Sequence, residues 1–256
     1  MDNQDKTDEQ RRYDHAYASI LAKGNRPPIV RGSAAMPPEL RSPYLCYEEN
    51  IFKHIGLGSR VLEIGAGSGL HTLALLETGA RVIATDISAA SLKLLSTQYH
   101  SLFNNFSVEL ADIESLPFAD SSFEFVTCAG SLSYGNPNLV FSEIQRVLRT
   151  GGTFICVDSL NNNPIYRFNR WVHYLRGVRT LSTLKNMPAI PEILKFHERF
   201  SRTEMSFFGS ATFLMPLLVQ LFGCERSAAF SDWVDRTINT RRSAFKFVLV
   251  ASNLTK

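Results

Sequence analysis

The sequence predicts an α/β fold, a doubly wound and mostly parallel sheet with helices on both faces. Short apolar runs alternate with helical patterns between residues 60 and 158, which is typical of parallel strands joined by helical crossovers. Glycines follow several of these runs, where a strand turns into a helix. The chain has 256 residues, of which 45% are hydrophobic, so it can bury a sizeable core in one domain.

The individual elements follow from the apolar runs and from the residues that end them. Residues 1–12 are polar and are expected to be disordered. A short helix at about 14–23 and a proline-rich loop precede a helix at 44–55. Strands are predicted at 60–64, 81–86, 106–110, 123–129 and 153–158. Helices are predicted at 69–78, 88–100 and 137–148, the second with Ser88 as its N-cap.

The regular alternation ends at Leu160. Residues 160–200 have no clean period and are interpreted as an insertion. Ser201 and Glu204 form a capping-box pattern before an apolar helix that ends near Phe222. The chain is expected to end in two antiparallel strands, at 227–232 and 245–252. The predicted organisation is a flexible N-terminal segment, 1–43, and one domain, 44–256, with the insertion at about 160–200.

Composition argues against several classes of protein. The net charge is only +3, so a surface devoted to nucleic acid is not indicated. The N-terminus has no apolar signal core, and no apolar run reaches the roughly 18 residues of a membrane span. The protein is therefore expected in the cytoplasm, with peripheral membrane contact left open. No metal is expected, because no zinc-ligand or CxxC spacing occurs among the cysteines, Cys46, Cys128, Cys156 and Cys224.

An acid ends the first predicted strand, and a glycine-rich turn follows it. Glu63 lies in that strand, and Gly65, Gly67 and Gly69 follow in alternate positions. Glycines at such a turn let the backbone approach a ligand closely. Asp86 ends the second strand, where a carboxylate can accept hydrogen bonds from both hydroxyls of a ribose.

A third acid completes a site for an adenosine-bearing cofactor. Asp112 and Ile113 follow the third strand, where an acid can bind an adenine edge and its apolar neighbour can pack on the ring. NAD is the obvious competitor, but Leu70 stands where the dinucleotide pattern G-x-G-x-x-G has its third glycine. A carboxylate at Glu63 would repel a pyrophosphate and attract a cationic ligand such as S-adenosylmethionine.

Together these motifs resemble those of class I S-adenosylmethionine-dependent methyltransferases, most of all the small-molecule branch that includes the ubiquinone-type enzymes. The resemblance also rests on the runs DIESLPF at 112–118 and SSFE at 121–124, and on the turn LRTGG at 148–152, where Thr150 replaces the usual proline. It covers residues 44–160. It implies a Rossmann-like sheet of seven strands with an antiparallel last strand and an insertion after strand five. A looser resemblance, to methyltransferase-like proteins of bacterial polysaccharide biosynthesis, implies a sugar-linked acceptor.

The family resemblance implies a role for each motif residue. Glu63 would lie near the methionine amino group, Asp86 would bind the ribose hydroxyls, and Asp112 would contact the adenine amino group. The N-terminal segment, with Tyr13 and Tyr17, would close over the cofactor as a lid. The remaining expected cofactor contacts are Gly65, Ala66, Gly67, Gly69, Ile87, Ile113, Cys128 and Ala129.

The acceptor is expected to bind to the segment after the fifth strand, and two interpretations of that segment stay open. In the first, arginines and aromatic side chains bind an anionic small molecule and His173 acts as a base. In the second, an apolar helix face packs on the domain and the arginines face solvent. His71 is a further candidate that could face the cofactor. The candidate substrate residues are Tyr166, Arg167, Arg170, His173, Tyr174 and Arg176, and the apolar face consists of Trp171, Tyr174, Leu175 and Val178.

The predicted function is methyl transfer from S-adenosylmethionine to a small polar acceptor, at an oxygen of a sugar-linked or other anionic molecule. Such a transfer needs alignment and a dry site more than a strong base. An NAD(P)-dependent oxidoreductase and a non-catalytic cofactor-binding module are the alternatives. The identity of the acceptor and the oligomeric state do not follow from the sequence.

Overall fold

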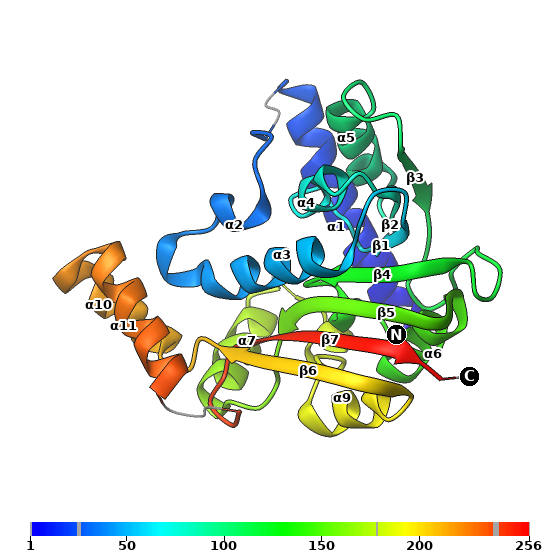
Figure 1. Ribbon diagram of the computed structural model, residues 1–256. Coiled ribbons are helices and arrows are strands. Elements are labelled where there is room, and N and C mark those ends of the chain that lie inside the picture. The colour runs from blue at the N-terminus through cyan, green and yellow to red at the C-terminus, as the bar shows by residue number, and fades with distance from the viewer. Residues whose placement is uncertain (1, 25–26, 178, 238–240, 256) are drawn as a thin grey trace.

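A seven-stranded sheet forms the centre of the protein (Figure 1). The computed structural model describes residues 2–24, 27–177, 179–237 and 241–255. The strand order is β3-β2-β1-β4-β5-β7-β6; the pairs from β3 to β5 are parallel, and β7 is antiparallel to both of its neighbours. The predicted sheet with an antiparallel last strand is therefore confirmed. The strands are β1 (Arg60–Ile64), β2 (Arg81–Asp86), β3 (Phe106–Leu110), β4 (Phe123–Ala129), β5 (Leu148–Ser159), β6 (Phe200–Phe208) and β7 (Lys246–Leu254).

Helices cover both faces of the sheet. One face is packed by α3 (Ser42–His54), α4 (Thr72–Glu77) and α5 (Ala89–Tyr99). The other face is packed by α6 (Pro137–Val147) and α9 (Ile190–His197). Val61 and Leu62 are neighbours on β1 but belong to the two opposite cores, because successive side chains of a strand point to opposite faces.

The strand order reverses between β1 and β4, and this reversal fixes where a ligand can bind. From β1 the chain crosses to β2 and β3 on one side and then returns to β4 on the other. The loops after β1 and β4 therefore diverge and leave a crevice at the carboxyl ends of these strands. In doubly wound sheets, ligands bind in this crevice.

The N-terminal residues form a long helix, so the expectation of disorder at 1–12 is wrong. Helix α1 (Asn3–Ala22) starts at Asp2, whose side chain accepts a hydrogen bond from the backbone N–H of Gln4. The helix predicted at 14–23 is only its second half. The sequence conceals α1 because the helix is mostly polar, with Glu9 as its one buried residue. It is stabilised by hydrogen bonds to other elements rather than by an apolar face of its own.

Two expectations for the C-terminal third are also wrong. Residues 200–208 form β6, which pairs with β7 along its length, so Ser201 and Glu204 cap no helix. The strand expected at 227–232 lies inside helix α11 (Cys224–Thr237). That helix buries Ser227, Ser231 and Val234, which have helical spacing. Two of the three are serines, so the sequence shows no apolar stripe that would predict a helix. The predicted end of a helix at Phe222 is confirmed by α10 (Met215–Phe222).

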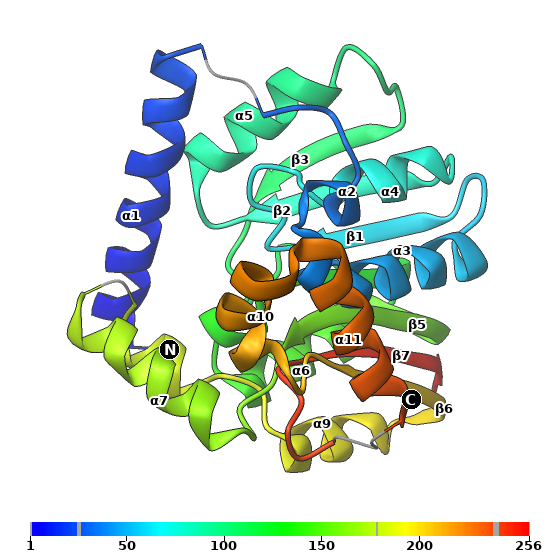
Figure 2. The same ribbon diagram turned by 90° about the vertical axis from the view of Figure 1, so that its left-hand side faces the viewer.

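The insertion after β5 consists mainly of helices rather than irregular loop. Helix α7 (Pro164–Leu175) begins at Asn163, whose side chain caps the N–H of Ile165, and α8 (Leu181–Lys185) precedes α9. Figure 1 shows α10 and α11 at the periphery of the domain, and Figure 2 shows α7 at its edge, with α1 reaching down to α7. The remaining short elements are α2 (Gly32–Ala35), η1 (Pro38–Leu40), η2 (Leu132–Tyr134) and η3 (Thr212–Leu214).

We predict that Gly69→Ala destabilises the fold more than Gly58→Ala does. Both glycines have positive φ, 86° and 78°, so alanine should cost about 1–2 kcal/mol at either position. A Cβ at Gly69 would also lie 2.2 Å from Leu95 Cδ1, whereas none of the described atoms lies within 4 Å of a Cβ at Gly58. We expect a further loss of about 1–3 kcal/mol at Gly69, measurable by urea denaturation. Equal losses would contradict the packing of the turn against α5.

Candidate cofactor-binding site

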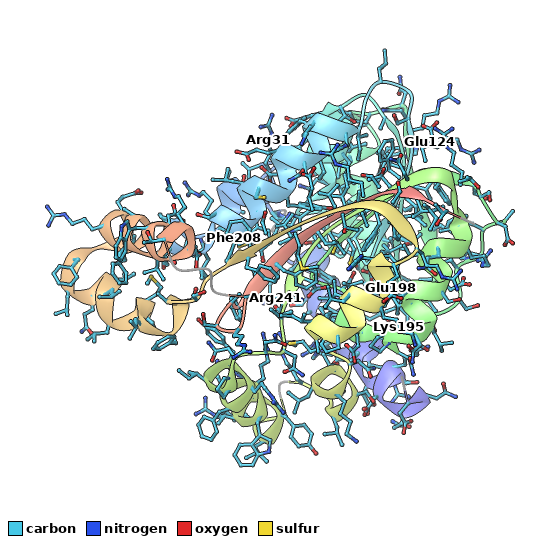
Figure 3. The ribbon with its side chains drawn as sticks, turned by 60° about the horizontal axis from the view of Figure 1, so that its bottom comes forward. Arg31, Glu124, Lys195, Glu198, Phe208 and Arg241 are labelled. Carbon is cyan, nitrogen blue, oxygen red and sulfur yellow. The ribbon has the colours of Figure 1, made fainter. Side chains whose placement is uncertain are left out.

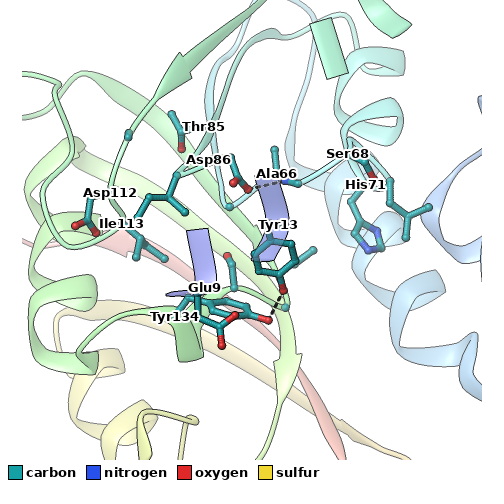
Figure 4. A pocket seen from close by; sticks show the side chains of 18 of the residues that line it. Glu9, Tyr13, Ala66, Ser68, His71, Thr85, Asp86, Asp112, Ile113 and Tyr134 are labelled. Atoms are coloured by element: carbon teal, nitrogen blue, oxygen red, sulfur yellow. Dashed lines mark hydrogen bonds between the residues drawn. The ribbon is translucent and has the colours of Figure 1, made fainter. Parts of the chain in front are cut away.

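A cavity of about 260 Å³ lies in the crevice between β1 and β4, under α1. Figure 4 shows Asp112 and Ile113 on one side, Asp86 near the middle, and Ser68 and His71 on the other side. Backbone and side chains from the ends of four strands, β1 to β4, and from α1 therefore converge there. The cavity is lined by Lys6, Glu9, Tyr13, Tyr17, Gly65, Ala66, Gly67, Ser68, Leu70, His71, Thr85, Asp86, Ile87, Ala111, Asp112, Ile113, Ala129, Gly130, Ser131 and Tyr134.

The glycine turn brings bare backbone to the cavity wall. Gly65 and Gly67 have φ values of 64° and 56°, in the left-handed region that favours glycine. A Cβ at Gly65 would lie 2.3 Å from the side chain of Ser131, at the start of η2. Only glycine therefore leaves room for the turn to pack against Ser131. A Cβ at Gly67 would approach the Tyr17 hydroxyl at 3.4 Å.

Asp86 holds the turn in place. Its Oδ2 accepts a hydrogen bond from the Gly67 N–H at 2.8 Å, and its Oδ1 accepts one from the Ser88 N–H at 2.9 Å. Burial raises the pKa of this carboxyl, and the two backbone donors oppose that rise. Because both donors favour the charged form, the carboxylate is held in a fixed orientation at the centre of the cavity wall.

Glu63 is buried beneath the turn and is not among the residues that line the cavity. Its Oε2 accepts a hydrogen bond from the Thr72 hydroxyl at 2.7 Å. Burial raises the pKa of Glu63 to about 8, so in the free protein this carboxyl is largely protonated at neutral pH. The sequence led us to expect a negative charge on Glu63 at all times. Instead, a cationic ligand would have to promote the ionisation of Glu63 when it binds.

Helix α1 covers the cavity with one stripe of side chains, from Lys6, Glu9, Tyr13 and Tyr17. Lys6 forms ion pairs with Asp112 and Glu114 at one end. Glu9 accepts hydrogen bonds from the hydroxyls of Thr180 and Thr183 at the start of α8, each at 3.2 Å. The helix is therefore fastened across the mouth of the cavity.

Tyr13 and Tyr134 close the cavity from below the glycine turn. Their hydroxyl groups form a hydrogen bond, and the two rings meet edge to face at 5.7 Å between centroids. Burial raises the pKa of Tyr13, so the phenol stays neutral. The pair joins α1 to η2 at the cavity wall.

His71 lies at the end of the cavity opposite Asp112 (Figure 4). Its ring stacks on Tyr44 at 5.0 Å, and Nδ1 finds no hydrogen-bond partner among the described residues. Burial lowers the pKa of His71 to about 4, and the nearby Lys246 charge adds to this effect. The imidazole is therefore neutral at physiological pH.

The structure brings most of the predicted cofactor residues to one cavity. Gly65, Ala66, Gly67, Asp86, Ile87, Asp112, Ile113 and Ala129 line it, whereas Glu63, Gly69 and Cys128 do not. Lys6 and Glu9 were missed, although the spacing of positions 6, 9, 13 and 17 matches one face of a helix. Ser131 and Tyr134 were also missed, because nothing in the sequence marks the turn after β4.

The predicted acceptor residues on α7 lie outside this cavity. Tyr166 donates a hydrogen bond to the Gly209 carbonyl, and Arg170 donates one to the Leu160 carbonyl, so both are buried structural links. Arg167 and Arg176 are exposed, and His173 and Tyr174 are partly exposed. The geometry gives His173 no contact with a molecule held in the cavity.

The alternative interpretation of α7, an apolar face packed on the domain, is wrong. Trp171 and Leu175 are exposed, whereas Arg170 is buried. Two polar side chains, Tyr166 and Arg170, fix the helix with its apolar side outward. Val178, the last member of the expected face, lies outside the described residues.

Within the described residues, no group of three His, Cys, Asp or Glu side chains could hold a metal ion. None of the helices in the described part of the chain is long and apolar enough to cross a membrane. All four cysteines are free, and Cys128 and Cys156 pack as small apolar side chains in the core.

A Rossmann-like sheet with an aspartate-and-glycine site at its switch point defines a class of proteins that bind nucleotide-like ligands. Comparison with known proteins narrows the class. Residues 62–156 match the family model described as a methyltransferase domain. This part of the chain is therefore similar to methyltransferase domains, in agreement with the resemblance that its motifs carry.

Two curated relatives share this part of the chain. A sterol 4-C-methyltransferase of Caenorhabditis elegans is 31% identical over 142 residues, which cover 51% of this chain and 42% of the relative. A demethylmenaquinone methyltransferase of Clavibacter sepedonicus is 36% identical over 118 residues, covering 43% of this chain and 45% of the relative. The match therefore spans less than half the length of each of these relatives.

Solved structures share the fold over a longer part of the chain. Geranyl diphosphate C-methyltransferase from Streptomyces coelicolor has a TM-score of 0.59 at 18% identity, over 82% of this chain and 79% of that one. A methyltransferase solved with the Haloferax volcanii Trm112 activator has a TM-score of 0.62 at 17% identity, over 95% and 98%. These likenesses extend the methyltransferase fold beyond the matched domain, into the C-terminal strands.

We predict that Glu63→Gln changes how stability depends on pH. Between the ordinary pKa of 4.5 and about 8, the unfolded chain has this carboxyl ionised while the folded protein keeps it protonated. The free energy of unfolding of the wild type should therefore fall with rising pH across this window, by up to about 1.4 kcal/mol per pH unit relative to the variant.

Urea denaturation of both proteins at several pH values would measure this difference. All other titrating groups contribute equally to the two curves, so their difference isolates Glu63. Curves that stay parallel from pH 4.5 to about 8 would contradict the raised pKa.

Proposed function

We propose that this protein is an S-adenosylmethionine-dependent methyltransferase that acts on a small-molecule acceptor. The observation that carries the proposal is the cavity itself: three carboxylates, Glu63, Asp86 and Asp112, lie along or beneath it, and α1 covers it. Acids at these points suit a ligand with an ammonium group, a ribose and an adenine, and they disfavour a pyrophosphate. The matched family and its named members support the same activity.

The cavity residues fit the parts of the cofactor in the order that Figure 4 displays. Asp112 and Ile113 would hold the adenine, and Asp86 with Ile87 would hold the ribose. The glycine turn and Ala129 would lie along the methionine portion, with Glu63 below it. Ionisation of Glu63 would then be favoured, because its carboxylate would face an ammonium group.

S-adenosylmethionine supplies a methyl group on a sulfonium, which a nucleophile can displace in line. The chain's own contribution is alignment and exclusion of water. Tyr13, Tyr17 and Tyr134 supply large, largely buried rings around the cavity. The fastening of α1 through Lys6 and Glu9 keeps that wall closed.

The acceptor is proposed to present a hydroxyl group at the His71 end of the cavity. A neutral imidazole can accept a hydrogen bond from such a group, and a base is needed only where the nucleophile must lose a proton. A sugar-linked acceptor remains a prediction of the sequence. The named relatives act on different molecules, a sterol and demethylmenaquinone among them, so they do not single out one acceptor.

We predict that S-adenosylhomocysteine binds the wild type at sub-millimolar concentration and binds Asp86→Asn about tenfold or more weakly. Asparagine removes the charge that accepts ribose and turn hydrogen bonds, and a hydrogen bond to a charged group contributes about 1.5–3 kcal/mol. Isothermal titration calorimetry measures both affinities. Glu225→Gln, on the distant helix α11, is the matched control and should bind as the wild type does.

The same titration with NADH separates the competing cofactor class. Tight NADH binding with no response to S-adenosylhomocysteine would overturn the proposal. Full affinity of Asp86→Asn for S-adenosylhomocysteine would show that the cavity is not the binding site.

We also predict that His71→Phe loses about 100-fold in methyl transfer while it keeps its affinity for S-adenosylhomocysteine. Phenylalanine preserves the stacking on Tyr44 but accepts no hydrogen bond, and general base catalysis contributes about 10²–10⁴-fold. The assay is transfer of a labelled methyl group to an acceptor first found in a screen of nucleotide sugars, glycolipids and quinone precursors. His100→Phe, an exposed position outside the cavity, is the control. Unchanged turnover of His71→Phe would remove His71 from the acceptor site.

A further inference from the structure

Helix α7 turns its apolar side toward solvent. Ile165, Phe168, Trp171 and Leu175 are between 47% and 64% exposed, and they recur at intervals of three and four residues, so they share one face. Isolated exposed apolar residues are common, but four large ones in a row on one helix form a patch. We call this row the α7 face. Figure 3 shows α7 at the edge of the molecule, with side chains extending outward.

The orientation of α7 is fixed by specific bonds, so the exposure is built into the fold. Tyr166 donates to the Gly209 carbonyl at 2.8 Å and accepts from the Phe213 N–H at 2.9 Å. On the same side, Arg170 donates to the Leu160 carbonyl at 2.9 Å and lies over the ring of Phe245. Rotating the helix to bury its apolar face would break all these contacts of Tyr166 and Arg170.

A second exposed apolar surface lies on α10, which follows the 3-10 helix that contacts the buried side of α7. The hydrogen bond from Phe213 to Tyr166 brings η3 and the start of α10 against the start of α7. Leu214, Leu217 and Leu221 are exposed at helical spacing along this part of the chain. No charged residue occurs anywhere from 209 to 224. Figure 1 shows α10 beyond the end of the sheet, and Figure 2 shows α7 at the edge of the domain.

The segment that carries the α7 face is basic. No acidic residue occurs between Asp158 and Glu192. The basic residues within that interval are Arg167, Arg170, Arg176, Arg179 and Lys185. Of these, Arg167, Arg176 and Lys185 are exposed. The exposed aromatic and aliphatic side chains of α7 thus lie in a segment whose charged residues are all basic.

We propose that the α7 face binds the surface of an anionic lipid bilayer. A helix with Trp, Phe and Leu on one side and arginines beside them is suited to the boundary between headgroups and acyl chains. The arginines attract anionic headgroups, and each basic residue near such a surface strengthens binding. A second copy of this chain is a poorer occupant, because two α7 segments would bring like charges together.

The surface lies next to the cover of the cavity. Thr180 and Ser182, at the start of α8, bond to Glu9 and Asp5 of α1. A bilayer bound at α7 would therefore be close to the anchored end of α1, where a lipid-dissolved molecule could approach the cavity. The membrane surface itself does not depend on the proposed methyl transfer, and its test involves no cofactor.

The primary test is cosedimentation of the full chain with vesicles. Vesicles of phosphatidylcholine mixed with phosphatidylglycerol are expected to carry the protein down, with binding that weakens as salt is added. Vesicles of phosphatidylcholine alone are expected to bind the protein at least tenfold more weakly, because the arginines then have no anionic headgroups to contact. Absence of binding to the anionic vesicles, or equal binding to both kinds, would overturn the proposal.

Fluorescence places the contact on α7. The chain has two tryptophans, Trp171 and Trp233, so Trp233→Phe leaves the α7 face as the only indole reporter. Its emission should shift to the blue with anionic vesicles and should be quenched by brominated acyl chains. Unshifted emission in a protein that cosediments would mean that another surface binds, and the proposal would fail.

Two double variants separate the apolar and charged contributions. Phe168→Ser with Trp171→Ser should weaken vesicle binding about tenfold or more, and Arg167→Gln with Arg176→Gln about 30-fold. The matched control is Leu57→Ser with Leu102→Ser, which removes two exposed leucines far from α7 in the sequence. The control should bind vesicles as the wild type does, and thermal unfolding checks that every variant is folded.

A different occupant of the surface has a distinct result. If light scattering without vesicles gives a dimer that Phe168→Ser with Trp171→Ser dissociates, and anionic vesicles do not bind, the α7 face joins two copies. If the apolar variant binds vesicles like the wild type, neither α7 nor its aromatic residues form the contact. Either result would overturn the membrane proposal.

Discussion

The carboxylate of Asp86 connects parts of the molecule that are distant in the sequence. It accepts hydrogen bonds from the N–H groups of Gly67 and Ser88, and so ties the turn after β1 to the start of α5. The Ser88 hydroxyl in turn donates to Asp14 of α1 at 2.6 Å and accepts from the Ser91 N–H. One network therefore shapes the ligand cavity, caps a helix and anchors the cover. A disturbance at Asp86 would reach all three.

The position of α1 over the cavity explains why most of its residues are polar. A helix that covers a ligand site must be held firmly enough to exclude water and loosely enough to release what it covers. Hydrogen bonds and ion pairs at Lys6, Glu9 and Asp14 hold α1 at separate points, and they can exchange with water at modest cost. A wide apolar face would bury the helix more permanently. The buried Glu63 fits the same logic, because its raised pKa keeps the position beneath the glycine turn largely uncharged in the free protein.

The sequence predicted the part of the fold that depends on local patterns. From β1 to β5, apolar runs, glycine turns and the Ser88 cap all agree with the sheet, and four of those five strands have the bounds expected from the apolar runs. Prediction failed where stability comes from contacts between distant segments. Strand β6 is defined by its pairing with β7, α1 by polar bonds to α5 and α8, and α11 by small buried serines. Of the cavity, the strand-end residues could be predicted, whereas Lys6, Glu9 and Tyr134 come from elements whose position only the tertiary structure determines.

Helix α7 marks the limit of amphipathic patterns as predictors. Its period correctly indicates a helix with two unlike sides, but it does not say which side faces the protein. That choice follows from the partners of the polar side: Tyr166 has both a donor and an acceptor. Nη1 of Arg170 donates to a carbonyl and the guanidinium lies over an aromatic ring, although Nη2 has no hydrogen-bond partner among the described residues. These contacts offset much of the free-energy cost of burying the polar side of α7. The apolar side is then left for a partner, and the arginines beside it restrict the chemistry of that partner to something negatively charged.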